Sequence, residues 1–223
     1  VKDIGRYIMK IVVVGSGALG SLVSGLLKAR TKEEVWLLDK SDEKAKKEND
    51  AGIRIEGLSG PLLARLNVTA NPKDIGNADI VFLCVKSYST DEACRNIKDI
   101  VTDKTRIVSL QNGLGNVQIM NDHFGEDRVV AGITNHGSTL VSVGVARHAG
   151  KGETVIGNAA GRVLGEIRTV ATVLSKAGFE TKISKDIDSV IWSKLIVNVG
   201  INALSAITRL PNGALAEHEE TKA

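Results

Sequence analysis

Three glycines near the start of the chain have the spacing G-x-G-x-x-G. Gly15, Gly17 and Gly20 follow a β-branched run at 11–14 and lead into a predicted helix over 21–30. In such a setting the first glycine permits a tight turn, the second lets a pyrophosphate approach the backbone, and the third lets the helix pack on the sheet. The helix N-terminus adds unpaired N–H groups for the phosphates. The pattern predicts a dinucleotide-binding loop, although a glycine-rich turn without a ligand has the same spacing.

An acidic residue, Asp39, ends the second apolar run at 35–38. A carboxylate there is placed to accept a hydrogen bond from the adenosine ribose 2′-hydroxyl, which favours NAD. Lys40 and Ser41 follow at once and suit a 2′-phosphate instead. A third reading is that Asp39 only caps the following turn.

Two polar side chains follow other apolar runs. Lys86 comes after the run 80–85, and Asn112 comes after the run 106–110. Because ligands bind open α/β sheets at the carboxyl ends of the strands, both side chains are expected at one crevice. Turn chemistry alone accounts for Asn112-Gly113 but not for Lys86.

A polar stripe crosses an apolar stretch near the end of the chain. Lys194, Asn198 and Asn202 are spaced i, i+4 and i+8 and therefore share one face of a helix. An amine and two amides on one face suit a polar cleft, since buried polar groups need partners. The alternatives are a solvated face and a hydrogen-bond network between helices.

The elements that must position these residues alternate between strands and helices over the first two thirds of the chain. This alternation predicts an α/β fold of the Rossmann type, with a doubly wound parallel sheet covered on both faces. We expect residues 139–148 and 154–156 to add antiparallel strands to that sheet. A helix over 163–177 is expected to end at Gly178.

The last part of the chain predicts a different structure. Apolar positions over 186–210 indicate a long, mostly buried helix that begins an all-helical domain. We therefore divide the chain into a dinucleotide-binding domain (1–184) and the start of a helical substrate and dimerisation domain (185–223). The residues after this helix are too few to cover it, so we expect a truncated domain or cover from another subunit. Residues 1–8 are interpreted as an extension.

Composition excludes several classes of protein. The chain has 223 residues, a net charge of +3 and only 3% aromatic residues, which argues against nucleic-acid binding. We expect no membrane span, signal peptide or metal site. Cys84 and Cys94 are interpreted as buried thiols rather than catalytic ones. A cytoplasmic location follows as the default.

In combination, these motifs resemble ketopantoate reductase (2-dehydropantoate 2-reductase). The resemblance runs from about Met9 to the end of the chain. Its motifs are Gly-Ser-Gly-Ala-Leu-Gly at 15–20, Val-Lys-Ser-Tyr at 85–88, Gln-Asn-Gly-Leu-Gly-Asn at 111–116, Thr-Asn-His-Gly at 134–137, Trp-Ser-Lys-Leu at 192–195 with Asn198 and Asn202, and Pro-Asn-Gly at 211–213.

The resemblance implies reduction of 2-dehydropantoate to pantoate with NADPH, on the route to pantothenate and coenzyme A. Lys194 would be the general acid, with Asn112, Asn198, Asn202 and Asn212 holding the substrate. The residues implied at the cofactor are Gly15, Ser16, Gly17, Ala18, Leu19, Gly20, Asp39, Lys40, Lys86, Asn112 and Ser138. NADP(H) is the expected cofactor, and Asp39 leaves NAD(H) open, because the family often has a basic residue there.

The resemblance also implies a homodimer, because this family pairs through its helical domain. That domain supplies a serine for the substrate and a glutamate at the cofactor, and this sequence has neither position. Two other functions stay open: a related reductase of another small 2-oxo acid, and a non-enzymatic dinucleotide-binding domain.

Overall fold

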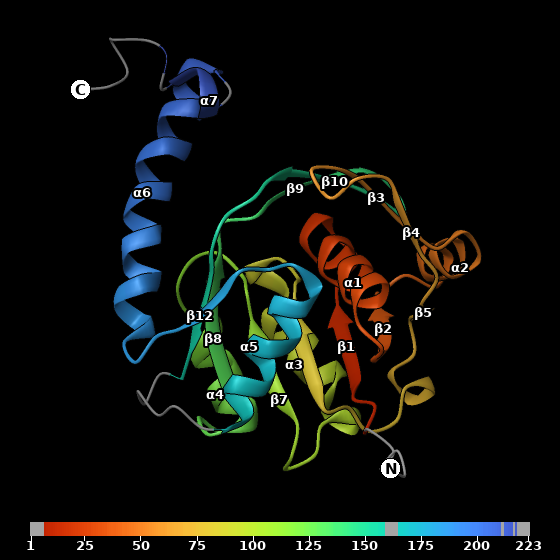
Figure 1. Cartoon of the computed structure of the whole chain (residues 1–223). Helices are drawn as coiled ribbons and strands as arrows, with labels where there is room; N and C mark the ends of the chain where they lie inside the picture. Colours follow the sequence, from red (N-terminus) through yellow and green to blue (C-terminus); the bar gives the residue numbers. More distant parts are fainter. Residues whose placement is uncertain (1–6, 159–164, 211, 216, 218–223) are drawn as a thin grey trace, which may run out of the picture.

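The computed structural model describes residues 7–158, 165–210, 212–215 and 217. Among these residues, eight strands form a central sheet in the order β12-β11-β8-β7-β6-β1-β2-β5 (Figure 1). The strands are β1 (Lys10–Val14), β2 (Glu34–Leu38), β5 (Asn67–Thr69), β6 (Ile80–Leu83), β7 (Arg106–Ser109), β8 (Val129–Thr134), β11 (Thr154–Gly157) and β12 (Thr181–Ile183). In sheet order, every neighbouring pair of strands between β8 and β5 is parallel, whereas β11 runs antiparallel to β8. The predicted Rossmann-type sheet with an antiparallel addition is confirmed.

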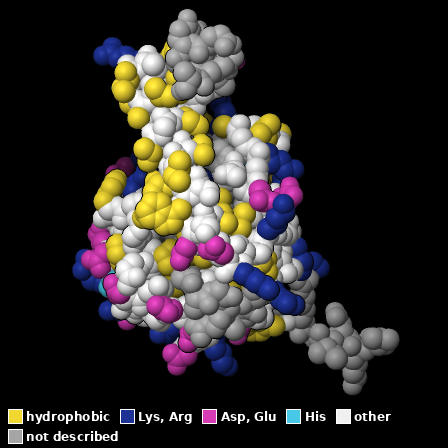
Figure 2. All heavy atoms as spheres, turned by 90° about the vertical axis from the view of Figure 1, so that its left-hand side faces the viewer, with side chains coloured by type: hydrophobic (Ala, Val, Ile, Leu, Met, Phe, Trp, Pro, Cys, Tyr) yellow, Lys and Arg dark blue, Asp and Glu magenta, His cyan; other side chains and the backbone are white. Residues whose placement is uncertain are grey.

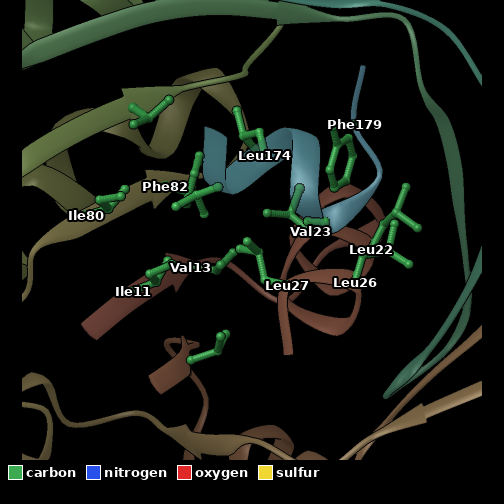
Figure 3. Packing of buried hydrophobic residues seen from close by; sticks show 14 of the residues in the cluster. Ile11, Val13, Leu22, Val23, Leu26, Leu27, Ile80, Phe82, Leu174 and Phe179 are labelled. Atoms are coloured by element: carbon green, nitrogen blue, oxygen red, sulfur yellow. The ribbon is translucent and has the colours of Figure 1, made fainter. Parts of the chain in front are cut away.

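Helices cover both faces of this sheet because its strands are apolar on both faces. In β1, Ile11 and Val13 pack in one core cluster, while Val12 and Val14 pack in the other. The first cluster lies under α1 (Ala18–Arg30) and α5 (Gly165–Ala177), as Figure 3 shows for Leu22, Leu26 and Leu174. The second lies under α3 (Thr90–Asn96) and α4 (Asn116–Phe124). This double cover is what the alternation of elements predicts.

A second sheet corrects one expectation. Residues 139–148 do not join the central sheet, because β9 (Gly137–Ser142) and β10 (Val145–Gly150) belong to a separate sheet of order β4-β3-β10-β9. Its other strands are β3 (Ile53–Gly57) and β4 (Leu62–Ala64). The sheet packs over the outer side of α1, where a Cβ on Gly25 would lie 2.9 Å from the Ile55 side chain. The apolar residues of β3 thus need α1 as their partner, which draws β10 away from β8.

The helix over 163–177 is found as α5 from Gly165 onward, since residues 159–164 lie outside the described ranges. Its predicted end is confirmed. Gly178 has φ +97°, and the N–H of Phe179 donates to the carbonyl of Leu174 at 3.0 Å. This is the left-handed helix end that favours glycine.

Another helix, α2 (Asp42–Ala51), lies beside β5 and is capped by Ser41, whose hydroxyl accepts from the N–H of Lys44. The short 3₁₀ turns are η1 (Pro72–Asp74), η2 (Ser87–Ser89) and η3 (Lys98–Ile100).

The long C-terminal helix is present but exposed. In α6 (Ile187–Thr208), Ile187 alone is buried, whereas Ile196 and Val199 are 69% and 61% exposed. Figure 1 shows α6 projecting from the body toward α7 (Asn212–Leu215), and Figure 2 shows hydrophobic side chains along it. The predicted burial is therefore wrong for the described chain, because the main contacts of α6 are with β8, β11 and α7. By length and apolar composition alone, α6 could cross a membrane. Core helices of soluble proteins meet the same two criteria.

Candidate active site

A crevice of about 1230 Å³ opens at the carboxyl ends of the parallel strands. It lies where β1 has β2 on one side and β6 on the other, which is the switch point of the strand order. Ten of the residues expected at a cofactor line it: Gly15, Ser16, Gly17, Ala18, Leu19, Asp39, Lys40, Lys86, Asn112 and Ser138. Gly20 lies behind this lining.

The three glycines occupy different environments. Gly15 has φ +97°, and a Cβ there would lie 2.9 Å from Val85 Cγ1. A Cβ on Gly20 would lie 1.8 Å from the carbonyl oxygen of Gly15, so the helix could not approach the loop with any larger residue. A Cβ on Gly17, by contrast, would meet nothing within 4 Å. A ligand that lies close to the backbone can occupy this open space because Gly17 has no side chain to fill it.

The start of α1 is suited to an anion. Its N-cap residue is Gly17, which has no side chain to cap the helix, and the first turn contains no acidic residue. The first N–H groups of a helix have no partner within the helix and carry a partial positive charge. The loop and the helix start therefore fit the pyrophosphate of a dinucleotide.

Asp39 anchors the glycine loop from the end of β2. Its Oδ2 accepts hydrogen bonds from the Ser16 hydroxyl at 2.6 Å and from the Lys44 ammonium at 3.2 Å, and its Oδ1 accepts from the Ser41 N–H at 3.0 Å. Burial alone would raise the pKa of Asp39, but these hydrogen bonds and the Lys44 charge together lower it. The carboxylate is thus ionised and mostly occupied, and Oδ1 keeps capacity for a ribose hydroxyl.

Lys40 differs from Lys44. Lys40 is exposed and lines the crevice. Within the described part of the chain, its ammonium group forms no ion pair. A 2′-phosphate would meet Lys40 first, since Lys44 is already held by Asp39 and by the carbonyl oxygen of Ser16 at 2.9 Å.

A buried hydrogen-bond network joins the two strand-end turns, and sequence reasoning missed it. The Gln111 amide donates to the carbonyl of Val85 and to the hydroxyl of Thr90, at 2.9 and 2.8 Å. Thr90 in turn donates to Asn116, whose amide donates to the carbonyl of Asn112 at 3.2 Å. The network fixes the turns that carry Lys86 and Asn112, both of which are exposed at the crevice. Gln111 and Asn116 flank the Asn-Gly motif, and that proximity was the available signal.

Lys194, on α6, does not line the crevice itself but is bonded to a residue that does. Its ammonium donates a hydrogen bond of 2.5 Å to the carbonyl oxygen of Thr134, a residue that lines the crevice. Burial lowers the pKa of Lys194 from its usual value. A half-buried amine with a lowered pKa at a crevice rim can hold a proton and release it to a nearby oxygen.

The three asparagines expected beside Lys194 do not reach the crevice. Asn198 is half-buried and Asn202 is exposed along α6, and neither lines the crevice. Asn212 lies on α7, where its side-chain oxygen accepts from the hydroxyl of Ser205. The structure therefore joins Lys194 to the crevice through Thr134, and it leaves the three asparagines outside the crevice lining.

Two histidines form a second feature that the sequence did not reveal. His136 lines the crevice, and its Nδ1 lies 2.9 Å from Nε2 of His148, whose Nδ1 lies 2.7 Å from the hydroxyl of Ser59. Burial is the main cause that lowers the pKa of both histidines. Phe179 packs against the ring of His136 at 4.8 Å. The pair joins the second sheet to the body of the protein.

The cysteines behave as inert thiols. Burial raises the pKa of Cys84 to about 12, and burial with the nearby Asp91 charge raises the pKa of Cys94 to about 11. A thiol with such a pKa is a poor nucleophile at neutral pH. Within the described ranges, no group of three or more His, Cys, Asp and Glu side chains is placed to hold a metal.

Comparison of the sequence with known protein families shows which family the chain belongs to. Residues 11–161 match the family described as "Ketopantoate reductase PanE/ApbA", and residues 186–223 match its C-terminal model. The chain belongs to the ketopantoate reductase family. The expected resemblance is thereby confirmed, including for the segment that contains α6.

Curated relatives of this ketopantoate reductase family member carry the name 2-dehydropantoate 2-reductase. The protein of Halobacterium salinarum is 39% identical over 210 residues, which are 94% of this chain and 69% of the relative. That of Pyrococcus horikoshii is 38% identical over 212 residues, or 95% of this chain and 68% of the relative. The chain thus spans somewhat over two thirds of their length.

Solved ketopantoate reductases have the same fold. A PanE/ApbA family ketopantoate reductase from Ralstonia eutropha superposes with a TM-score of 0.83 at 29% identity, covering 96% of this chain and 69% of that one. The 2-dehydropantoate 2-reductase from Geobacter metallireducens gives 0.87 at 27% identity, covering 96% and 70%. A ternary structure of D-mandelate dehydrogenase with NADH and anilino(oxo)acetate shares the fold, with a TM-score of 0.86 at 23% identity over 96% of this chain and 69% of that one.

Proposed function

We propose that this protein reduces 2-dehydropantoate to pantoate with a nicotinamide dinucleotide, in the formation of pantothenate and coenzyme A. The observation that carries the proposal is the Lys194 ammonium bound to Thr134 at the rim of the crevice that the glycine loop enters. The names of the relatives agree with it. We also propose residues 1–184 as the cofactor domain and 185–223 as the start of the helical domain.

The residues of this chain divide the chemistry as follows. When bound in the crevice, a reduced nicotinamide would supply a hydride for C2 of the 2-oxo acid, so that negative charge would develop on the ketone oxygen. Lys194 neutralises that charge by passing a proton from Nζ to the oxygen, and the Thr134 carbonyl keeps Nζ oriented. The glycine loop and the start of α1 hold the pyrophosphate. Asn112, Asn198, Asn202 and Asn212 are proposed to hold the substrate.

We propose NADP(H) as the cofactor, with NAD(H) as the alternative that Asp39 supports. Lys40 favours the 2′-phosphate, and the free capacity on Asp39 favours the ribose hydroxyl. Separate titrations of NADPH and NADH decide between them. The matched variants are Lys40→Ala and Lys46→Ala, both at exposed positions. If the proposal holds, the Lys40 change alone weakens NADPH binding and leaves NADH binding unchanged.

The activity test follows the oxidation of the reduced cofactor with 2-dehydropantoate, in this chain and in a form extended to the length of its relatives. A panel of small 2-oxo acids separates 2-dehydropantoate from the alternative substrates. Cofactor binding without turnover by either form would favour a non-enzymatic dinucleotide-binding domain and overturn the proposal. A cytoplasmic location and a homodimer stay predictions.

A further inference from the structure

A fully buried carboxyl group lies in the cluster that supports the glycine loop. Glu48, on the inner face of α2, has no exposed surface, and neither carboxyl oxygen has a hydrogen-bond partner. A buried carboxyl group without a hydrogen bond is uncommon, because a charged group that leaves water loses free energy that hydrogen bonds and opposite charges must restore. The sequence analysis assigned Glu48 no role, and the proposed chemistry does not use it.

One ammonium group serves two carboxyl groups here. Lys44 Nζ lies 3.2 Å from Asp39 Oδ2 and 4.0 Å from Glu48 Oε1, and it donates to the carbonyl oxygen of Ser16 at 2.9 Å. With both acids ionised the cluster has a net charge of −1, directly behind the loop that faces the crevice. A proton on Glu48 brings the cluster to neutrality and leaves Lys44 to Asp39 and Ser16.

The surroundings of Glu48 contain few other charges. Burial raises its pKa, Lys44 opposes that rise, and Asp39 adds to it. The Ser16 hydroxyl of the glycine loop and the backbone of Gly144, in the turn between β9 and β10, also lower the pKa of Glu48. Neither group forms a hydrogen bond with it. Arg54 of β3 donates its backbone N–H to the carbonyl oxygen of Gly144, and Arg54 is an exposed residue. The proton on Glu48 therefore responds to Ser16, Lys44 and Asp39, and to any charge placed on the loop.

We propose that Glu48 links dinucleotide affinity to pH, because its carboxyl group takes up a proton when a pyrophosphate binds the glycine loop. Two phosphate charges on the loop disfavour the −1 cluster behind it, so the protonated form of Glu48 binds the ligand better. An ionised Glu48 also competes with Ser16 for the Lys44 ammonium, which loosens the support of the loop. This inference rests on the proposed dinucleotide binding.

The test measures NADH binding by calorimetry in buffers of different ionisation enthalpy. NADH is the probe because it lacks the 2′-phosphate, a group that itself titrates near neutral pH. We expect wild type to take up a fraction of a proton on binding NADH over part of the pH range above 4.5, the ordinary pKa of a glutamate carboxyl group. The Kd rises with pH over that interval, by at most about tenfold per pH unit, since a single proton is exchanged.

Two matched variants assign the proton. Glu48→Gln keeps the size of the side chain and mimics its protonated form, so NADH binding should lose the uptake and most of the pH dependence. Glu43→Gln, at an exposed position of the same helix that pairs with Lys47, should behave as wild type. Measurement on wild type alone keeps the inference testable if Glu48→Gln fails to fold.

The outcomes are separable. NADH binding without proton uptake, or equal uptake by wild type and Glu48→Gln, overturns the role of Glu48. Equal uptake would assign the proton to another group, such as His136 at the crevice. No NADH binding at any pH overturns the proposed dinucleotide binding itself, and this inference with it.

Discussion

The Lys194 ammonium on α6 donates a hydrogen bond to the carbonyl oxygen of Thr134, the last residue of β8. Thr134 is itself fixed, because its hydroxyl lies 2.9 Å from that of Thr154 and accepts from the N–H of His136. The position of the amine is therefore set by the sheet as well as by its own helix. This contact holds the Lys194 ammonium beside the crevice although most of α6 is exposed.

Lys194→Ala should lower kcat by about 10²–10⁴-fold, because the proton donor for the ketone oxygen is lost. The Kd for NADPH and NADH should stay nearly unchanged, since the glycine loop is untouched. Steady-state kinetics and cofactor titration measure the two effects, in a form of the protein extended to the length of its relatives. Lys185→Ala, at an exposed position, is the control, and near-wild-type turnover by Lys194→Ala would refute the assignment.

Gly17→Ala and Gly20→Ala should fail for different reasons. A Cβ at Gly17 meets no protein atom, so folding should be unaffected or stabilised by up to about 1 kcal/mol. The new methyl enters the space proposed for the pyrophosphate, and NADH affinity should fall by at least about tenfold.

At Gly20 the Cβ would lie 1.8 Å from the Gly15 carbonyl oxygen, so we expect the free energy of unfolding to fall by about 3 kcal/mol. Denaturant unfolding and NADH titration of both variants check the contrast. Unchanged NADH affinity in Gly17→Ala would place the ligand elsewhere.

Asp39→Asn should lower the free energy of unfolding by about 2 kcal/mol at neutral pH, because a largely buried carboxylate that binds Ser16, Ser41 and Lys44 loses its charge. The pKa of Asp39 is lowered in the folded protein, so its contribution exists above its unfolded value of 3.8 and disappears as pH falls below it. The difference between wild type and variant should therefore narrow in acid. Urea unfolding at several pH values measures it, and a constant difference would contradict the ionised state of Asp39.

The His136–His148 pair should make stability depend on pH. The pKa of both histidines is lowered in the folded protein, so the unfolded chain binds more protons below its value of 6.5. Stability is then full above pH 6.5 and is lost as pH falls through the interval down to the folded pKa values. Each kcal/mol lost corresponds to about 2–4 °C in Tm. His148→Gln should show a weaker loss as pH falls below 6.5, and parallel curves for both proteins would contradict this origin.

Local sequence predicts most of the central sheet. The run that ends at Val14 and most of the run at 80–85 are strands because continuous apolar residues suit a sheet that is buried on both faces. The second sheet was not predictable in this way. β3 pairs with β10, which lies far along the chain, and only packing on α1 selects that pairing.

Prediction of the site had the same limit. Local patterns reveal the chemical types of the glycine loop, Asp39, Lys86, Asn112 and Lys194. The structure places the glycine loop, Asp39, Lys86 and Asn112 at one crevice, and Lys194 is joined to it through the carbonyl of Thr134. Side chains whose role depends on a distant partner gave no local signal, such as Thr90, His148 and Glu48. The burial of α6 also depends on what packs against it, so its apolar pattern predicts the helix but not its exposure in the described chain.

The turn at Gly15 has a consequence for how fast and how tightly a ligand is captured. Val85, which follows the end of β6, occupies the place of a side chain at Gly15, so the packing of the neighbouring strand end favours the turn. A binding loop shaped by its own framework loses little conformational entropy when a ligand arrives, and more of the contact energy is retained as affinity. The receptor for the phosphates is thus preorganised, and its association with a dinucleotide does not wait for the loop to order.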